Sequence, residues 1–583
     1  MPAGGDETRL IRYNRFLLLV AGLGGLLYGI DVGIVGGAVP YLEATSHLSP
    51  AELSIIVAAV LLGSVFSTLF AGLLADWMGR KPLMMVSGIA FTLSIPVIAL
   101  SQGYSALFFG RLLQGMSGGL VGVVVPLYLA ECLSAEKRGR GTGIFQWMLT
   151  LGIFAAAVIG VLVSYHVDAV SRAGSADALF HAKDSAWRSI FWMSMPPGLL
   201  FVLGTFFISE SPRWLFRRGQ SDAAHTALLR SRTGEQAAIE LHEMEGIASE
   251  TVAKAKVREG RREPLLQRRY VLPFLLACVI LSCNTATGIN SVIGFNTNIL
   301  ISSGLKDVQA HWGYVIFTAM NFLLTTVGMT LVDRKGRKFL FLVGTSGIIV
   351  ALTTAGLLFV RSEKNRTDVA SAVQSQVGSD EQLTLSANQA ARQLGANAVN
   401  EALTVIYSYG DFTGTTTPVA LDDPAAAPIE ITRKAALPGG KVESFFRNPF
   451  ANLDAARTAP LHIDHAYLQQ VPSESNGWLM AICLYVFVGF YAMGPGVCVW
   501  LALSELMPTR IRSNGMSVAL VINQLVSTML AAVFLPVVGK HGYSTMFFLF
   551  VGFTVIYFFT VLLFLPETKG KTLEEIEKHF ETA

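Results

Sequence analysis

Charged side chains are scarce in this sequence. Asp, Glu, Lys and Arg together make up 15% of its 583 residues, whereas soluble proteins carry about 25%. Hydrophobic residues account for 52%. This balance excludes an ordinary soluble globular protein and indicates a protein that crosses a membrane several times.

Cysteine and the usual signatures of enzyme chemistry are also rare or missing. The five cysteines all lie in or at the ends of long apolar runs, so we expect no structural disulfide. No glycine-rich phosphate loop follows a strand, and His462 and His465 are best interpreted as a solvated surface pair because nothing nearby completes a metal site. We therefore expect no enzyme activity, no cofactor and no metal. The net charge of +3 is attributed to membrane topology, and no nucleic-acid partner is expected.

Apolar runs of membrane length are abundant. About 20 helical residues cross the hydrocarbon core of a bilayer. The sequence therefore predicts an all-α membrane protein with twelve transmembrane helices, near 16–40, 53–75, 83–101, 105–131, 141–165, 187–208, 271–301, 310–332, 338–360, 477–507, 511–538 and 543–565.

Basic clusters indicate the orientation, since they favour the cytoplasmic side. All of them fall on one side if both termini are cytoplasmic. The clusters lie at 80–81, 137–140, 209–270, 334–338, 510–512 and 569–571. We expect a multi-pass protein of the plasma (inner) membrane, monomeric and surrounded by lipid.

Two patterns occur once in each half of the chain. The sequence Asp-x-x-Gly-Arg-Lys begins at Asp76 after the second run and at Asp333 after the eighth. A glutamate precedes an arginine by seven residues at the ends of the fourth and tenth runs, as Glu131 with Arg138 and Glu505 with Arg512. This repeat predicts two pseudo-symmetric halves of six helices.

The repeat also locates an insertion. Asp76 and Glu131 are 55 residues apart, but Asp333 and Glu505 are 172 apart, which leaves 117 extra residues in the second half. These match a polar extracytoplasmic stretch at 361–476. We expect a small, partly ordered cap there, with an amphipathic helix at 386–409.

The predicted organisation has four parts. They are an N-terminal six-helix half at 1–208, a cytoplasmic helical linker at 209–270, a C-terminal half at 271–565 that contains the insertion, and a cytoplasmic tail at 566–583. A flexible linker is the alternative for 209–270.

Asp31 and Arg111 are ionisable residues inside apolar runs. A charge at bilayer depth costs at least ~3 kcal/mol, so it marks a functional pathway by default. Their depths below the outer helix ends differ by only about 5 Å at ~1.5 Å per residue. An acid and a base at similar depth suggest a proton-linked switch, and a static ion pair is the alternative.

The repeated Gly-Arg-Lys loops are interpreted as a gate, whose ion pairs close the cytoplasmic side of the protein in one state. Ordinary topogenic charge is the alternative. The predicted gate residues are Asp76, Arg80, Glu131, Arg138, Asp333, Arg337, Glu505 and Arg512.

With these motifs, the chain resembles the sugar porter family of the major facilitator superfamily. The resemblance covers the whole chain except the loop insertions, and two of its motifs, SPRWL and PETKG, are highly specific. It is carried by GLLADWMGRK (72–81), GRLLQGMSGG (110–119), PLYLAE (126–131), KRGRG (137–141), SESPRWL (209–215), GIN (288–290), DRKGRK (333–338), GPGVCVW (494–500), SELMPTRIR (504–512) and PETKGKTLEEI (566–576).

The resemblance implies alternating access, with a sugar held between the two halves. The sugar-contacting positions it implies are Gln146, Asn290, Asn321, Trp500 and Asn523. Amides can donate to and accept from sugar hydroxyls, and an aromatic face can cover C–H bonds. Helix–helix hydrogen bonding is the alternative for each single amide.

This sequence departs from the family before and after the GIN motif. Asn284 and Thr285 stand where two glutamines are frequent, and Gly294 and Phe295 stand where two tyrosines are frequent. We include Asn284 and Thr285 in the expected sugar site. The departures put a standard hexose in doubt, so a pentose, a polyol or a larger sugar is conceivable.

Asp31 matches the position that carries Asp in the proton symporters of the family and usually Asn in passive facilitators, and Arg111 matches its arginine partner. The resemblance therefore implies proton-coupled import of a sugar or polyol. A passive facilitator is the first alternative. A transporter-like sugar sensor is less favoured, because only about 18 residues follow the last predicted span.

Overall fold

The computed structural model describes residues 4–569 and Phe580, apart from 47, 134, 174, 259–266, 365, 395–400, 417–418, 422–427, 439, 442–443, 445–450, 471 and 508–510. Among the described residues, twelve helical stretches are long and apolar enough to cross a membrane, so the predicted number of spans is confirmed. They are formed by α1 (Gly4–Thr45), α2 (Pro50–Met78), α3 (Arg80–Ala99), α4 (Tyr104–Cys132), α5 (Ala135–Ala173), α6 (Ala176–Trp192) with α7 (Met195–Phe207), α11 (Arg268–Ala286) with α12 (Ile289–Gly294), α14 (Asp307–Lys335), α15 (Arg337–Glu363), α21 (Glu474–Met493) with α22 (Pro495–Leu506), α23 (Arg512–His541) and α24 (Tyr543–Phe564).

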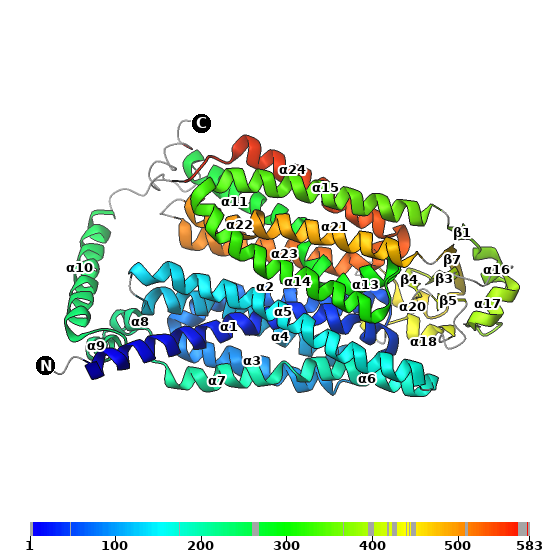
Figure 1. Ribbon diagram of the computed structural model, residues 1–583, viewed down its shortest axis with the longest axis horizontal. Coiled ribbons are helices and arrows are strands. Elements are labelled where there is room, and N and C mark those ends of the chain that lie inside the picture. Colours follow the sequence, from blue (N-terminus) through cyan, green and yellow to red (C-terminus); the bar gives the residue numbers. More distant parts are fainter. Residues whose placement is uncertain are drawn as a thin grey trace.

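The spans lie side by side in one bundle (Figure 1). Helix α1 begins and α24 ends at the same end of the bundle, which we call the terminal end. The helices α8 (Pro212–Arg217), α9 (Ser221–Leu229) and α10 (Gly234–Arg258) also lie there. The described residues between α15 and α21 form a small unit at the opposite end, called the insert end.

Three predicted spans are broken rather than continuous. The seventh span consists of α11, α12 and then α13 (Asn296–Ser302). Gly288 separates the first two with φ 86°, and a Cβ at this position would lie 2.5 Å from the ring of Phe550. The tenth span breaks before Pro495, which has no backbone N–H to continue the helix. The sixth span breaks between α6 and α7.

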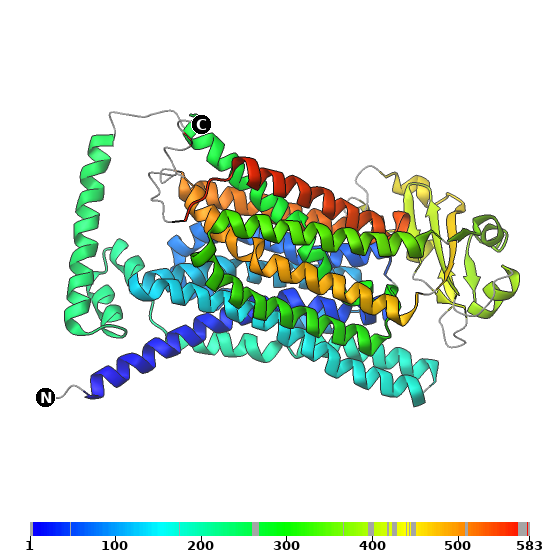
Figure 2. The same cartoon turned by 45° about the horizontal axis from the view of Figure 1, so that its top comes forward.

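The unit at the insert end is built on antiparallel strands (Figure 2). One sheet has the order β1-β7-β3-β4, with β5 also paired to β3, and β2 pairs with β6. The strands are β1 (Thr367–Asp368), β2 (Leu383–Leu385), β3 (Glu401–Tyr409), β4 (Phe412–Thr415), β5 (Val419–Ala420), β6 (Ile429–Ile431) and β7 (Leu461–Gln470), and the helices are α16 (Ala370–Gln374), α17 (Ala387–Gln393), α18 (Arg433–Ala436) and α20 (Leu453–Ala456).

The helix expected at 386–409 is wrong for its second part. Residues 387–393 form α17, but 401–409 form β3, and 395–400 lie outside the described residues. The segment EALTVIYSY is rich in β-branched and aromatic residues, which favour a strand. Its neighbour β7 pairs with it from Glu401 opposite Gln470 to Tyr409 opposite Leu461. A separate hydrophobic core, which includes Leu403, Val405 and Ile463, holds this unit together.

The hydrophobic core of the bundle differs between its two ends. Toward the insert end, a single cluster joins residues of both halves, such as Ile34, Val57, Ile293 and Phe534. Toward the terminal end, one cluster contains only residues of the N-terminal half and another only residues of the C-terminal half. The two halves are therefore packed together most closely toward the insert end.

Candidate functional site

Asp31 on α1 and Arg111 on α4 face each other inside the N-terminal half. Both side chains are buried, and Arg111 Nη1 lies 3.6 Å from Asp31 Oδ1. Neither carboxylate oxygen of Asp31 accepts a hydrogen bond within the described part of the chain. The structure thus brings together the two ionisable residues that the sequence placed at similar depth.

Gln114 also contacts this ion pair, and the sequence analysis did not predict it. Arg111 Nη1 donates a hydrogen bond to Gln114 Oε1 at 2.5 Å, and the guanidinium lies 5.5 Å from the centre of the Phe191 ring. Gln114 stands three residues after Arg111, so both occupy one face of α4. The arginine is therefore held more closely by the amide than by the carboxylate.

Three of the predicted sugar-site residues take part in two hydrogen-bonded pairs in the C-terminal half. The Thr285 hydroxyl donates to Asn523 Oδ1. Asn290 Nδ2 donates to Ser527 at 2.7 Å. Ser527 was not predicted, although it lies one helical turn after Asn523. Together they join α11 and α12 to α23.

Asn284 of α11 contacts α21. Its Nδ2 donates to the Tyr491 hydroxyl at 3.2 Å, and its Oδ1 has no partner among the described residues. Asn296, at the start of α13, is fully buried, and both its amide atoms are unpaired within the same described ranges. Tyr491 and Asn296 were missed, because an isolated polar residue in an apolar helix gives no sign of what it faces.

The remaining predicted sugar-site residues come from other helices. Gln146 on α5 is half-buried, and Asn321 on α14 is buried. Trp500 on α22 is 45% exposed. Within the described part of the chain, no side-chain hydrogen bond joins these three to the polar residues on α11, α12 and α23. Their role stays a prediction.

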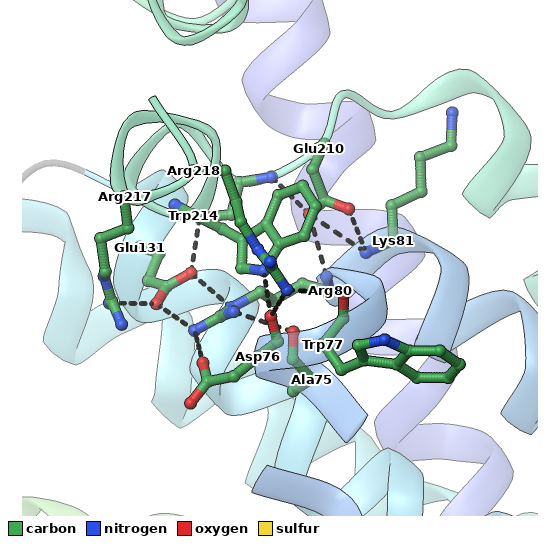
Figure 3. Close-up of polar contacts among 11 residues, drawn as sticks. Ala75, Asp76, Trp77, Arg80, Lys81, Glu131, Glu210, Trp214, Arg217 and Arg218 are labelled. Atoms are coloured by element: carbon green, nitrogen blue, oxygen red, sulfur yellow. Dashed lines mark hydrogen bonds and ion pairs between the residues drawn. The ribbon is translucent and has the colours of Figure 1, made fainter. Parts of the chain in front are cut away.

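Three of the four predicted gate residues of the N-terminal half, Asp76, Arg80 and Glu131, meet in one network (Figure 3). Arg80 is buried and lies 2.8 Å from Glu131 and 3.0 Å from Asp76. Glu131 also contacts Arg217 at 3.1 Å and accepts from the Ser211 hydroxyl at 2.5 Å. This network therefore ties α2, α3 and α4 to α8.

The C-terminal half repeats the arrangement. Arg337 lies 2.9 Å from Glu505, which also accepts from the Thr568 hydroxyl at 2.5 Å. The side chains of Arg138, Asp333 and Arg512 lie outside the described residues. Among the gate residues that the structure describes, each ion pair joins helices of one half and none joins the two halves.

Glu210 and Glu567 are parts of these networks that the sequence reasoning missed. Glu210 accepts from the backbone N–H groups of Arg80, Lys81 and Ser211 at 3.0, 3.2 and 2.7 Å. Glu567 accepts from the N–H groups of Arg337 and Lys338 at 3.1 and 3.2 Å. The signal was present, because a glutamate followed by a hydroxyl residue occurs in both SESPRWL and PETKG.

The preceding turns explain why glycine stands before each arginine. Gly79 has φ 100° and Gly336 has φ 91°, in a region of backbone conformation that is essentially restricted to glycine. A Cβ would also lie 2.3 Å from Glu210 Oε2 or 2.6 Å from Glu567 Oε2. Burial raises the pKa of Glu210 above its ordinary value, while the N–H groups that it accepts from act against this shift.

The two halves are joined by hydrogen bonds toward the insert end. Tyr314 donates to the carbonyl of Gly33 at 2.8 Å, and Thr297 donates to that of Gly36 at 2.6 Å. The N–H of Leu535 donates to Ser54 at 3.1 Å. These contacts lie in the region of the shared hydrophobic cluster.

Comparison with known proteins places this architecture in a family. The profile of the family described as "Sugar (and other) transporter" matches residues 17–375 and 459–580. The glucose transporter GlcP of Staphylococcus epidermidis is 25% identical over 97% of each chain. The human proton myo-inositol cotransporter is 26% identical over 99% of this chain and 83% of its own.

A solved structure has the same fold. The inward open conformation of the xylose transporter XylE from E. coli superposes with a TM-score of 0.62 at 20% identity, over 96% of this chain and 98% of that chain. These relatives are transporters rather than enzymes. This chain is a multi-pass membrane protein, and it belongs to the sugar porter family of the major facilitator superfamily.

Proposed function

We propose that this protein imports a sugar or sugar-like polyol together with protons by alternating access. The observation that carries the proposal is the buried pair of Asp31 and Arg111, whose carboxylate accepts no hydrogen bond from the described residues. Burial disfavours an ionised carboxylate and a nearby arginine favours it. A conformational change that alters their separation would therefore change whether Asp31 holds a proton.

The hydrogen bond from Arg111 to Gln114 supports this role. It offers the arginine an alternative partner 2.5 Å away, so the guanidinium need not be left unpaired when it separates from Asp31. An unpaired buried charge would cost several kcal/mol. Gln114 would thus lower the cost of moving Arg111 between a carboxylate-bound and a carboxylate-free position.

We infer that the structure represents the state that is closed at the insert end. The shared hydrophobic cluster and the hydrogen bonds of Tyr314 and Thr297 lie toward that end. At the terminal end, the described networks of Arg80 and Arg337 each stay within one half. With both termini in the cytoplasm, as the basic clusters favour, this state faces inward.

The sugar would bind between the halves. We assign Asn284, Thr285, Asn290, Asn321, Trp500 and Asn523 in the C-terminal half and Gln146 in the N-terminal half to its site. The unpaired Asn284 Oδ1 supports the assignment, because a buried amide oxygen without a partner is costly unless a ligand or water fills the gap.

Other parts of the proposal follow from the same organisation. The two halves are 1–208 and 271–565, separated by the 209–270 linker and followed by the 566–583 tail, with the 361–476 insertion outside the cell. The gate residues would form contacts between the halves in the opposite state. We propose a monomer in the plasma membrane. The proton myo-inositol cotransporters among the relatives favour symport. A facilitated glucose transporter is also among them, so uniport is the alternative function that the experiment must exclude.

The test is the substitution Asp31→Asn, which keeps the shape and removes the titratable group. In proteoliposomes, it should abolish sugar accumulation driven by a pH gradient while sugar exchange between equal pools survives. The matched control is Asp177→Asn, which changes an exposed carboxylate and should behave as the unmodified protein. Uphill accumulation by Asp31→Asn, or sugar uptake by the unmodified protein without proton movement, would replace symport with facilitated diffusion.

A further inference from the structure

His311 occupies an unusual position at the interface between the halves. It is carried by α14 of the C-terminal half and is fully buried. Its ring enters a notch in the N-terminal half formed by Gly37 on α1 and Gly160 on α5, where a Cβ on Gly160 would lie 3.3 Å from Cδ2. The ring of Tyr41 stacks on it, with centroids 5.3 Å apart.

Both ring nitrogens of His311 face oxygen atoms that can only accept. Nδ1 lies 2.9 Å from the carbonyl oxygen of Asp307 and 3.4 Å from its carboxylate. Nε2 lies 3.1 Å from the carbonyl oxygen of Gly37. A neutral imidazole has one N–H and one lone pair, so it could satisfy only one of these nitrogens. The imidazolium form, with two N–H groups, satisfies both.

The charged and titratable groups around the notch come from four helices. Asp307 lies one turn before His311 on α14 and accepts from the Tyr41 hydroxyl of α1 at 2.7 Å. Lys183 on α6 lies near Asp307. Asp168 on α5 lies near Tyr41 and pairs with Arg172 at 2.6 Å. The carboxylate of Asp307 is the charged group in contact with the imidazole, and its sign favours the imidazolium.

We propose that His311 is a second protonation site, which locks the insert end closed when it carries two protons. Opening this end separates α14 from α1 and α5, so it must pull the imidazole out of the notch and away from the Gly37 carbonyl. A deprotonated ring leaves a lone pair facing one of the two carbonyl oxygens. Loss of the proton therefore weakens the closed state, and acid on the insert side strengthens it.

This proton differs from the one assigned to Asp31. His311 is buried at the insert end while that end is closed, and it is exposed to the insert side when that end opens. Its proton is therefore taken from and returned to the same side and is not transported. The inference rests on the proposed alternation between two states but not on proton transport by Asp31.

The test measures the distance between the two halves at the insert end as a function of pH. Spin labels are attached at Ser171→Cys and Ser475→Cys, two exposed positions on α5 and α21; the native cysteines in the structure are buried. Pulsed electron double resonance then measures the distance between the two spin labels, and the distance distribution gives the ratio of closed to open protein. We expect this ratio to fall about tenfold between pH 5.5 and pH 8, the range in which histidines titrate.

The substitution His311→Gln should abolish this pH dependence. The matched control is His166→Gln, which changes an exposed histidine on α5 and should keep the full profile. The Asp31→Asn background should also keep it, so a failure here is distinguishable from a failure of proton symport. A profile that is flat in the unmodified protein, or unchanged in His311→Gln, would overturn the proposal.

A second measurement does not depend on the variant folding. In protein labelled with nitrogen-15 at histidine only, magnetic resonance should detect one imidazole with both nitrogens protonated at a pH where exposed histidines are neutral. If every imidazole is neutral in a sample that the spin labels show to be closed, the proposal is also overturned.

Discussion

The two networks at the terminal end use the same parts with different degrees of burial. In both, a glycine with positive φ precedes an arginine, the arginine contacts a glutamate, and a second glutamate accepts from the N–H groups after the glycine. Arg80 and Glu131 are 1% and 5% exposed, whereas Arg337 and Glu505 are 15% and 21% exposed. The repeat therefore conserves geometry between the halves but not the environment of the charges.

The difference comes from what covers each network. In the N-terminal half, α8 lies over it, with Arg217 on Glu131 and with Trp214 and Arg218 donating to the carbonyl oxygen of Asp76 at 2.9 and 2.8 Å. In the C-terminal half, the chain after α24 supplies Thr568 on Glu505 and Lys569 on the carbonyl of Arg334. Removing one partner of a buried ion pair costs more than removing one partner of an exposed pair. The N-terminal network should thus tolerate less change.

The largest effect is expected from Glu131→Gln. It removes the buried carboxylate that balances the charge of Arg80, leaves it only the exposed carboxylate of Asp76, and also releases Arg217. We therefore expect a loss of about 3–5 kcal/mol in the free energy of unfolding. The matched variant is Glu505→Gln, for which partial exposure should limit the loss to about 1–2 kcal/mol. Denaturant unfolding in bicelles measures both values. Equal losses would show that burial does not distinguish the two networks.

A smaller effect, equal in both halves, is expected from Gly79→Ala and Gly336→Ala. Each places a side chain at a positive φ and against a glutamate oxygen, at a cost of about 1–3 kcal/mol. The control is Gly72→Ala inside α2, where a Cβ would meet no neighbouring atom within 4 Å. Thermal unfolding of purified protein compares the three. A clearly larger loss in one half would mean that the two turns are not equivalent.

The smallest effect is expected from Arg217→Ala, which removes a contact of the N-terminal network that no described residue repeats in the C-terminal network. The side chain of Arg217 is 60% exposed, so its pairing with Glu131 should contribute about 0–1 kcal/mol. Arg217→Lys keeps the charge, so its loss in the free energy of unfolding should be smaller than that of Arg217→Ala. If Arg217→Ala were as damaging as Glu131→Gln, the exposed arginine rather than burial would explain the asymmetry.

Several elements of this comparison could be predicted from the sequence. The repeat predicted that the two Gly-Arg-Lys loops and the glutamates Glu131 and Glu505 lie at the same end of the bundle, because equal spacing in two halves of one chain predicts equal positions in space. It did not predict which glutamate pairs with which arginine. The positions of Asp31 and Arg111 along their helices also predicted that they meet. Glu210 and Glu567 were not predicted, since each reaches the turn from a segment far away in the sequence.

The sequence by itself determined the twelve spans, the two halves and the depth of Asp31 and Arg111, because apolar run length and repeat spacing are local properties of the chain. Only the tertiary structure decided that Arg111 donates to Gln114, that β3 is a strand beside β7, and that His311 lies in a notch between Gly37 and Gly160. The physical reason is that a hydrogen bond or a packing notch depends on which surfaces distant segments present to each other. Hydrophobic periodicity shows which residues are buried, but it does not show which neighbour they are buried against.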